Sequence, residues 1–283
     1  MSNFDKQYLK LCETILKKGV RTKNRTGTDT IKIPFATFHF DVRKEFPILN
    51  SKYVAWKAAI LEILWIYQVA SNDVRWLQER NIKIWNEWMI DEKGYYQGKY
   101  FGQDLAYTIG TAYGAIVQKY QLTKRLIDNI KQDSSNRRLV MSLWQESELA
   151  TGVLPPCVFL TMWDITDGKL NLIVTQRSCD VALGLPFNVT QYATLLSLIA
   201  HVTKLKVGTL EWVIKDAHLY VNQIDGIKEQ IARYQTMDIK EKAKLVINKR
   251  VTDFFKFDNS IDCRDIQVAN YINLGKIKMP VSV

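Results

Sequence analysis

Residues 154–188 have the sequence LPPCVFLTMWDITDGKLNLIVTQRSCDVALGLPFN, and this stretch decides the fold class. Two apolar runs, Val158–Trp163 and Leu170–Thr175, lie on either side of the dipeptide Asp167-Gly168. Aspartate followed by glycine between two such runs is a strong hairpin signal, because both residues accept the positive backbone angles of a tight turn. The stretch therefore predicts two antiparallel strands that lead into a polar loop.

Helices and strands are mixed along the rest of the chain without a strict strand-helix-strand alternation. Asn188 precedes a long apolar helix that we expect to end near Val202. This mixture indicates an α+β fold rather than a doubly wound one. No repeat or flexible linker divides the sequence, so we expect one domain over residues 1–283. The other expected elements are helices from Phe4 to about Lys18 and from Tyr53 to Val69, and strands at Thr30–Val42 with an interruption at Pro34, at Leu139–Trp144, and starting at Trp212–Ile214.

The composition excludes intrinsic disorder and favours an anionic partner. The chain has 283 residues, of which 47% are hydrophobic, so a sizeable core can form without disulfide or metal staples. Its formal charge of +10 suits a nucleic acid, a phosphorylated metabolite or an acidic cofactor. The positive residues are spread along the chain rather than gathered in one tract, which argues against a nucleic-acid binder.

Two further classes are excluded by patterns that the sequence lacks. It has no run of about 18 uncharged apolar residues, and its N-terminus lacks the apolar core and cleavage site of a secretory signal. We therefore expect a soluble, cytoplasmic protein with no membrane partner. The four cysteines and three histidines are too scattered for a disulfide framework or a zinc site with two close ligand pairs, so we expect no metal.

Cys157 is the candidate nucleophile. It follows Pro155 and Pro156, whose rings restrict the backbone that leads to the thiol. Cysteine is also among the most buried residue types, so a small hydrophobic core residue is the alternative interpretation. A neighbouring cation would decide between them, because the thiolate is the reactive form and an arginine stabilises it.

Several arginines are candidates for binding an anionic ligand. Gln176-Arg177-Ser178 lies at the end of a predicted strand, where guanidinium, hydroxyl and backbone amide groups together suit a phosphate. Arg25 stands in the turn sequence NRTGT, and the adjacent Arg137 and Arg138 follow a second turn. Each of these arginines taken singly is also explained as an exposed charge in solvent.

Three polar residues match the recognition of a nucleoside. Asn188 offers a donor beside an acceptor, as O4 and N3–H of uracil require, whereas a carboxylate would prefer the amino edge of cytosine. Capping of the following helix would also explain an asparagine at this position. His218 and Tyr220 are two residues apart and so share one face of a strand, where they would bind one hydroxyl together or form an ordinary half-buried pair.

An acid and two tryptophans complete the candidates. Glu62 is the sole acid in the apolar segment Tyr53–Val69, and a carboxylate on a buried helix requires a reason. Trp85 and Trp88 are three residues apart on an expected helix face, a pattern that more often indicates core packing than a stacking platform.

Together these motifs resemble the thymidylate synthase family along nearly the whole chain. The resemblance implies a methyltransferase that converts dUMP to dTMP with the cosubstrate 5,10-methylenetetrahydrofolate and releases dihydrofolate, without metal, flavin or NAD. It also implies a three-layer domain with a mixed sheet flanked by helices, one sheet face forming a homodimer interface. The motifs are RTGT at 25–28, LPPC at 154–157, QRSCD at 176–180, GLPFN at 184–188, DAHLY at 216–220 and the final Pro280-Val281.

The resemblance implies a role toward the nucleotide for most of the candidates. Cys157 would add to C6 of the pyrimidine in a covalent step, with Arg177 assisting the thiolate. Asn188 would bind the uracil edge, and His218 with Tyr220 the ribose 3′-hydroxyl. The residues expected to bind dUMP are Arg25, Gln176, Arg177, Ser178, Asn188, His218 and Tyr220, with Arg137 and Arg138 reaching the phosphate from the other subunit of the homodimer.

A second set of roles concerns the folate and the proton transfers. Glu62 matches the family glutamate that orders water and moves protons around O4, with a pKa tuned by burial. Tyr113 matches the tyrosine near C5 that participates in proton removal. The expected catalytic residues are Cys157, Glu62, Tyr113, Arg177, Asp180 and Asn188, and the expected folate contacts are Lys52, at the glutamyl tail, with Trp85, Trp88, Asp180, Gly184 and Phe187.

One departure and two alternatives qualify this interpretation. Val158 stands where many family members carry histidine after the nucleophile, and it cannot donate to a water network. A pyrimidine hydroxymethylase would share the fold, the nucleophile and the folate but would add water in place of hydride; Asn188 argues against its cytosine version. A basic nucleic-acid-binding module is the alternative from another class, and its affinity would fall steeply with salt. The enzyme itself does not require nucleic acid.

Overall fold

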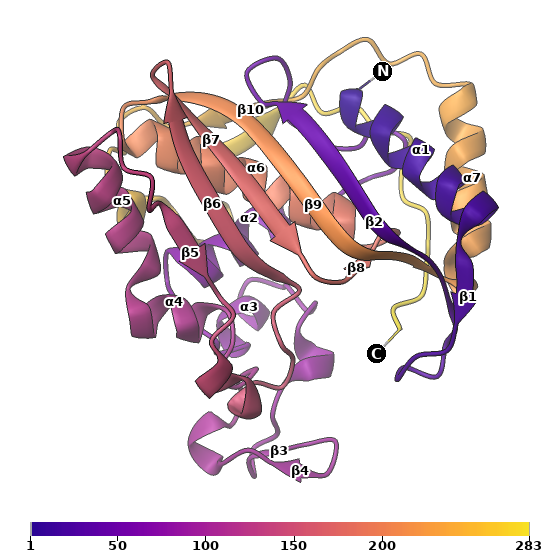
Figure 1. Cartoon of the computed structure of the whole chain (residues 1–283), viewed down its shortest axis with the longest axis horizontal. Coiled ribbons are helices and arrows are strands. Elements are labelled where there is room, and N and C mark those ends of the chain that lie inside the picture. The colour runs from indigo at the N-terminus through magenta and orange to yellow at the C-terminus, as the bar shows by residue number, and fades with distance from the viewer. Residues whose placement is uncertain (1, 283) are drawn as a thin grey trace.

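A seven-stranded mixed sheet forms the front of the molecule as it is seen in Figure 1. The computed structural model describes residues 2–282. The strands lie side by side in the order β1-β2-β9-β7-β6-β5, and the short β8 also pairs with β9. Their bounds are β1 Val20–Thr22, β2 Thr30–Asp41, β5 Val140–Ser142, β6 Val158–Thr166, β7 Lys169–Gln176, β8 Cys179–Asp180 and β9 Lys206–Tyr220; β3 Tyr95–Tyr96 pairs with β4 Lys99–Tyr100, and β10 Lys244–Ile247 with β11 Ile266–Ala269.

The predicted hairpin is confirmed. β6 and β7 are antiparallel, and Thr166 faces Lys169 across the turn, where Asp167 and Gly168 have φ angles of 53° and 66°. β7 and β9 are parallel, so the chain must cross behind the sheet between them, and α6 (Gly184–Val202) makes this crossover. β8 also pairs with β9 in parallel, and these two parallel pairs within an otherwise antiparallel sheet give the mixed α+β fold that the sequence predicts.

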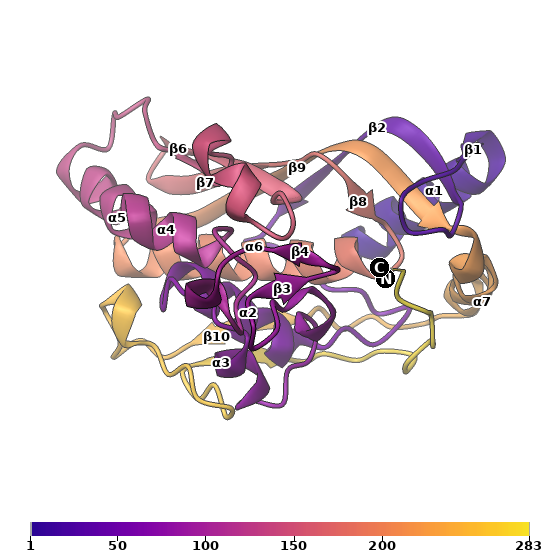
Figure 2. The same ribbon diagram turned by 90° about the horizontal axis from the view of Figure 1, so that it is seen from below.

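Two apolar helices form a second layer behind the sheet (Figure 2). α2 (Trp56–Tyr67) and α6 are buried on nearly all sides, because the sheet covers one side and the segment that holds β10 and β11 covers the other. This explains why neither helix has a polar face. The other helices are α1 Asn3–Lys18, α3 Arg75–Gln78, α4 Gly114–Tyr120, α5 Leu122–Gln132 and α7 Ile224–Gln235, with 3-10 turns at Asn86–Trp88, Gln103–Leu105, Glu146–Thr151, Val221–Gln223 and Phe254–Lys256.

Three local predictions were wrong. β9 begins at Lys206 rather than at Trp212, because the residues before Trp212 already pair in parallel with β7. Asn188 lies inside α6 and does not cap it; the carboxylate of Asp180 accepts hydrogen bonds from the backbone that leads into the helix. The two tryptophans do not share a helix face, because the 3-10 turn Asn86–Trp88 is too short to form one.

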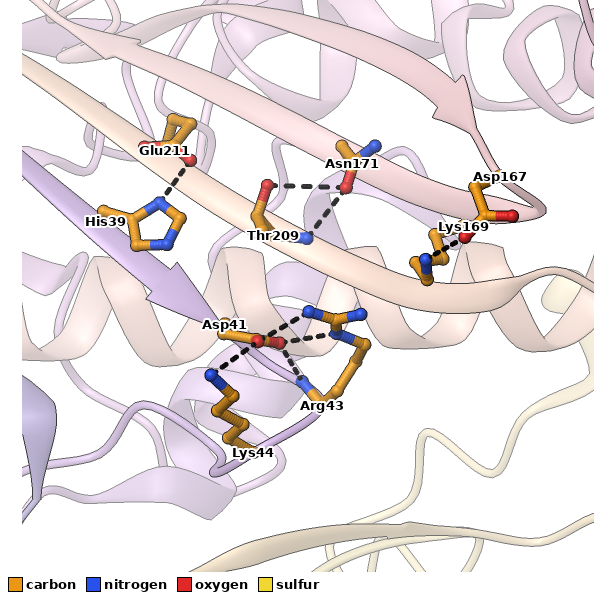
Figure 3. A network of polar contacts seen from close by, with 9 residues as sticks. All are labelled: His39, Asp41, Arg43, Lys44, Asp167, Lys169, Asn171, Thr209 and Glu211. Carbon is orange, nitrogen blue, oxygen red and sulfur yellow. Dashed lines mark hydrogen bonds and ion pairs between the residues drawn. The ribbon is translucent and has the colours of Figure 1, made fainter.

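The face of the sheet that is turned to the viewer in Figure 1 is covered by no helix of residues 2–282. Strand registers place His39, Glu211, Ile173 and Val140 in one row across this face. His39 Nδ1 lies 2.5 Å from Glu211 Oε1 (Figure 3), whereas Ile173 and Val140 remain 37% and 50% exposed. Phe35 on the same face is 61% exposed. An uncovered apolar face of this kind is typical of a protein interface.

Candidate active site

A cavity of about 680 Å³ lies where β7 ends and β8 and α6 begin. Its walls come from segments far apart in the chain, including α2, the loop before β2, the end of β9 and Val281 near the C-terminus. A concave site with convergent polar groups is the usual form of a ligand pocket. The predicted site residues that line it are Arg25, Glu62, Trp85, Trp88, Tyr113, Cys157, Arg177, Ser178, Asp180, Gly184, Phe187, Asn188, His218 and Tyr220.

Cys157 is held next to a guanidinium group. Arg177 donates from Nε to the carbonyl of Pro156 at 3.0 Å and from Nη2 to the carbonyl of Pro155 at 2.6 Å. The same Nη2 lies 3.9 Å from the Cys157 sulfur. The hairpin explains this placement, because Cys157 precedes β6 and Arg177 follows β7, and the backbone N–H of Arg177 donates to the carbonyl of Cys157 at 2.9 Å. The cation that the nucleophile interpretation requires is therefore present.

The charge state of the thiol reflects two opposed effects. Burial raises the pKa of Cys157 above its ordinary value, and the positive charge of Arg177 opposes this rise. Arg177 therefore makes the thiolate easier to form than burial alone would allow. Tyr113 touches the same segment, since its hydroxyl accepts the backbone N–H of Cys157 at 3.0 Å. Tyr113 adopts a φ angle of 46°, a strained value for a side chain of this size.

An anionic group would find several donors in the cavity. Arg25, Arg177 and Ser178 all line it. Arg25 is presented by a turn in which Asn24 Oδ1 accepts the backbone N–H of Thr26 at 2.8 Å. Two arginines of separate segments beside a serine can bind a phosphate in a bidentate manner.

His218 and Tyr220 lie together at the end of β9, as their spacing predicts. Their ring centroids are 5.3 Å apart, and both residues line the cavity. Two residues that the sequence interpretation missed adjoin them. Asp216 Oδ2 lies 3.4 Å from Lys32 Nζ, while Asp216 Oδ1 is buried without a hydrogen-bond partner among residues 2–282. Asp216 has a φ angle of 58°, and no sequence signal marked it beyond its place in DAHLY.

Glu62 points from α2 into the cavity, where its carboxylate is nearly closed to solvent. Trp85 Nε1 donates to one of its oxygens at 2.7 Å, and Gln191 Nε2 donates to the other at 2.8 Å. Burial raises the pKa of Glu62 to about 7, although both hydrogen bonds act to lower it. A carboxyl group with this pKa can give or accept a proton near neutral pH. Gln191 was also missed, although its place three residues after Asn188 on a helix was a signal.

Part of the cavity lining is aromatic. Trp85 contacts Trp88 and Tyr113 edge to face, with centroids 5.7 and 5.3 Å apart. Trp88 Nε1 is buried without a hydrogen-bond partner among residues 2–282, so it can donate to a bound molecule. Phe187 and Gly184, on the first turn of α6, also line the cavity. Such a wall suits a flat heteroaromatic ligand.

Four predicted site residues do not line this cavity. Gln176 is buried directly behind it and donates to Asn188. Lys52 is 5% exposed, and its ammonium group donates to the carbonyl of Ala182. Burial lowers the pKa of Lys52 to about 8 against the pull of Asp180. Arg137 and Arg138 are exposed in the loop between α5 and β5. The roles predicted for these four residues stay predictions.

The family model described as thymidylate synthase matches residues 6–283. This chain belongs to the thymidylate synthase family. It is 44% identical to thymidylate synthase from Clostridium beijerinckii and 38% identical to the enzyme from Bacillus mojavensis, over the full length of each pair. Its structure is similar to thermostable thymidylate synthase A from Bacillus subtilis, with a TM-score of 0.85 and 35% identity over 99% of both chains.

Membership in the thymidylate synthase family confirms the predicted methyltransferase class and the predicted mixed-sheet fold. These similarities support neither the hydroxymethylase nor the nucleic-acid-binding alternative. Residues 2–282 hold no cluster of histidine, cysteine and acidic side chains placed to bind a metal ion. In the same part of the chain, no helix is both long and apolar enough to cross a membrane.

Val158, where the family resemblance leads us to expect histidine, allows a test. It is 4% exposed and begins β6 directly after Cys157. We expect Val158→His to change the pH dependence of turnover modestly rather than to abolish activity, because an imidazole adds a titrating donor while the thiol and Arg177 stay in place. The measurement is the pH–rate profile of both proteins. Superimposable profiles would show that position 158 has no part in the proton relay.

Proposed function

We propose that this chain converts dUMP to dTMP with 5,10-methylenetetrahydrofolate and releases dihydrofolate. The observation that carries the proposal is the single cavity that Cys157, two cavity arginines, Asn188 and an aromatic wall share. One catalytic domain over residues 1–283 belongs to the proposal, and the family match from residue 6 onward supports it. A cytoplasmic location stays a prediction.

Nucleotide binding positions the ring over the sulfur. Arg25, Arg177 and Ser178 would hold the 5′-phosphate, and His218 with Tyr220 the ribose 3′-hydroxyl. Asn188, which also lines the cavity, would then pair with the uracil edge. Holding both ends of the nucleotide brings C6 close to the thiol, and this orientation lowers the barrier for an attack that is otherwise bimolecular.

The chemical steps begin when the Cys157 thiol loses its proton and the sulfur forms a bond to C6. The electrons of the C5–C6 double bond move toward O4, and C5 then forms a bond to the methylene carbon of the folate as one of the two bonds from that carbon to folate nitrogens breaks. C5 loses its proton, the second carbon–nitrogen bond breaks, and an exocyclic methylene group is left on the pyrimidine. Hydride from the released tetrahydrofolate reduces this methylene to a methyl group, which oxidises the folate to dihydrofolate, and the sulfur departs from C6 to restore the C5–C6 double bond.

Two buried groups are proposed to handle the protons. Glu62 would exchange a proton through water with O4 as charge builds on that oxygen, which suits a carboxyl group with a pKa of about 7. Tyr113 would assist the removal of the C5 proton, and its hydroxyl, which accepts the backbone N–H of Cys157, supports this role by lying beside the nucleophile.

The aromatic wall is proposed to bind the folate. The ring system would stack between Trp85, Trp88 and Phe187, with Gly184 allowing close approach and Asp180 bonding the pterin. Lys52 would meet the acidic glutamyl tail. Because its ammonium group now donates to Ala182, this last contact requires the Lys52 side chain to turn outward.

We also propose a homodimer that uses the uncovered face of the sheet. Exposed Phe35, Val140 and Ile173 support it, since two copies of one face can bury each other. Arg137 and Arg138 are exposed on a loop beside this face, next to β5, and would reach the phosphate of the partner's cavity.

Arginines supplied across the interface should restore activity in a mixed dimer. Arg137→Ala/Arg138→Ala is expected to lower kcat/KM for dUMP roughly 100-fold, since charge-assisted hydrogen bonds are lost. When it is co-expressed with Cys157→Ser, one site of each hybrid dimer has every residue intact. Activity per protomer should then reach about a quarter of the wild-type value. If activity stays at the level of the two parents, the arginines act within their own subunit.

Incubation of the protein with dUMP and methylenetetrahydrofolate tests the reaction itself. We expect dTMP by mass and dihydrofolate by absorbance in equal amounts. A hydroxymethylated product without dihydrofolate would contradict the proposal and would indicate the hydroxymethylase reaction. Binding only to RNA or DNA, weakening steeply with salt, would contradict it in favour of the nucleic-acid module.

A further inference from the structure

A continuous chain of side-chain hydrogen bonds runs beneath the cavity. Trp212 Nε1 donates to Gln176 Oε1 at 3.0 Å, and Gln176 Nε2 donates to Asn188 Oδ1 at 3.3 Å. Asn188 Nδ2 then donates to Gln191 Oε1 at 2.9 Å, and Gln191 Nε2 donates to Glu62 Oε2 at 2.8 Å. Gln176 and Gln191 are each 2% exposed, so water does not compete for these bonds.

The Trp212 end of this chain fixes its direction. An indole N–H can only donate, whereas a carboxamide both donates and accepts. The Trp212 indole therefore holds the oxygen of Gln176, which turns the nitrogen of Gln176 toward Asn188. At the other end, Glu62 accepts from Trp85 as well as from Gln191. If the side-chain amide of Gln176, Asn188 or Gln191 rotated by 180° alone, its NH2 group would face another donor and its oxygen another acceptor.

The fixed direction determines what Asn188 offers to the cavity. Its Oδ1 already accepts from Gln176 and its Nδ2 already donates to Gln191, so each atom has one hydrogen-bonding position left. The free donor lies on the side of Glu62, and the free acceptor lies on the side of Gln176. Uracil presents O4 and N3–H, which match this order. Cytosine presents an amino donor and an N3 acceptor, which require the reverse order.

We propose that Gln191 is a positioning residue that holds the Asn188 carboxamide in the uracil-reading orientation, and so sets the preference for dUMP over dCMP. The inference rests on the proposed function. Gln191 has this role because its bond to Asn188 is the shorter of the two, at 2.9 Å against 3.3 Å from Gln176. Within this series of hydrogen bonds, Gln191 is also the residue that links Asn188 to Glu62.

The variant Gln191→Met tests the proposal, because methionine has a similar length and neither donates nor accepts as the amide does. The measurement is the dissociation constant for dUMP and for dCMP by calorimetry. We expect the ratio of the two constants to fall about tenfold, because one orienting hydrogen bond is lost. If the substitution only loosens the structure, it should weaken the binding of dUMP and dCMP by the same factor. An unchanged ratio of the two dissociation constants would therefore overturn the proposal.

Gln230 supplies the matched control. It is a buried glutamine that donates to Ser51 Oγ at 2.8 Å, away from the cavity. Gln230→Met removes a buried amide of the same kind, and we expect it to keep the wild-type preference. A ratio that falls equally in both variants would assign the effect to lost stability and would overturn the role of Gln191.

A second variant breaks the chain at its end if Gln191→Met does not fold. Glu62→Gln keeps the volume of the side chain, but its single oxygen cannot serve Trp85 and Gln191 as the two carboxylate oxygens do. The preference for dUMP in binding should again fall several-fold, and an unchanged preference contradicts the proposal. If the wild-type protein binds dUMP and forms dTMP but the variants keep the wild-type preference for dUMP, only this inference is overturned. A wild-type protein that binds neither nucleotide overturns the proposed function and the inference with it.

Discussion

Cys157→Ser is expected to lower kcat by roughly 10⁴-fold or more, because the hydroxyl that replaces the thiol is a far weaker nucleophile at the same position. Arg177 lies 3.9 Å from the sulfur and assists a thiolate, but it cannot ionise an alcohol. The affinity for dUMP should stay close to the wild-type value, because the phosphate, ribose and uracil contacts all come from other residues. Turnover assays and calorimetry with dUMP measure the two effects separately.

Cys263→Ser is the matched control for this substitution. Cys263 is a free, buried cysteine that does not line the cavity. We expect this variant to keep its turnover even where it loses some stability. Near wild-type kcat in Cys157→Ser would show that the sulfur forms no covalent bond to the substrate, and the proposed reaction would have to be given up.

Glu62→Gln is expected to lower kcat by about 10²- to 10³-fold, since a general acid or base contributes a factor of this order. The amide cannot give or accept a proton, although it fills the same space between Trp85 and Gln191. The inflection near pH 7 that Glu62 contributes to the pH–rate profile should also disappear. An unchanged kcat across the pH range would exclude Glu62 from the proton relay.

The same substitution should change how stability depends on pH. Burial raises the pKa of Glu62 from 4.5 to about 7, so the folded state binds a proton more tightly than the unfolded state does. The stability that the folded protein gains from this tighter proton binding is fully present below pH 4.5 and is lost as the pH rises through 7. Relative to wild type, Glu62→Gln should therefore gain about 3 kcal/mol of unfolding free energy between pH 4.5 and pH 8.5.

Urea unfolding at the two pH values measures this gain. The exposed Glu79, whose side chain is 71% accessible, serves as the control position. Glu79→Gln should show no pH-dependent difference from wild type. A difference of the same size in both variants would mean that the effect comes from the total charge of the protein and not from the buried carboxyl group.

Local sequence patterns were sufficient wherever the physical cause was local. Asp167-Gly168 predicted the β6–β7 hairpin because its two residues accept the turn's backbone angles. The register of that hairpin in turn places Cys157 beside Arg177, so the contact of nucleophile and cation follows from a turn ten residues away. The helix expected from Phe4 to about Lys18 is also confirmed, as α1, and the Ser2 side chain caps its start by accepting the backbone N–H of Asp5.

Patterns failed where a distant segment supplied the cause. Lys206 begins β9 because Lys169 of β7 pairs with it, and that partner lies 37 residues earlier in the chain. Gln191 looks like an ordinary polar residue in an apolar helix until α2 brings Glu62 to within 2.8 Å. The ion pair of Asp216 cannot be read from its local sequence, because its partner Lys32 lies on the neighbouring strand β2.

The sequence by itself determined the candidate reactive and ligand-binding side chains, the family resemblance, and the elements whose turns and caps depend on only a few neighbouring residues. The tertiary structure alone decided which of these groups meet in one cavity, how far burial moves the pKa of Glu62, and which way the Asn188 amide faces. The reason is that desolvation and hydrogen-bond direction depend on neighbours from α2, α6 and β9, and the order of residues along the chain does not state those neighbours.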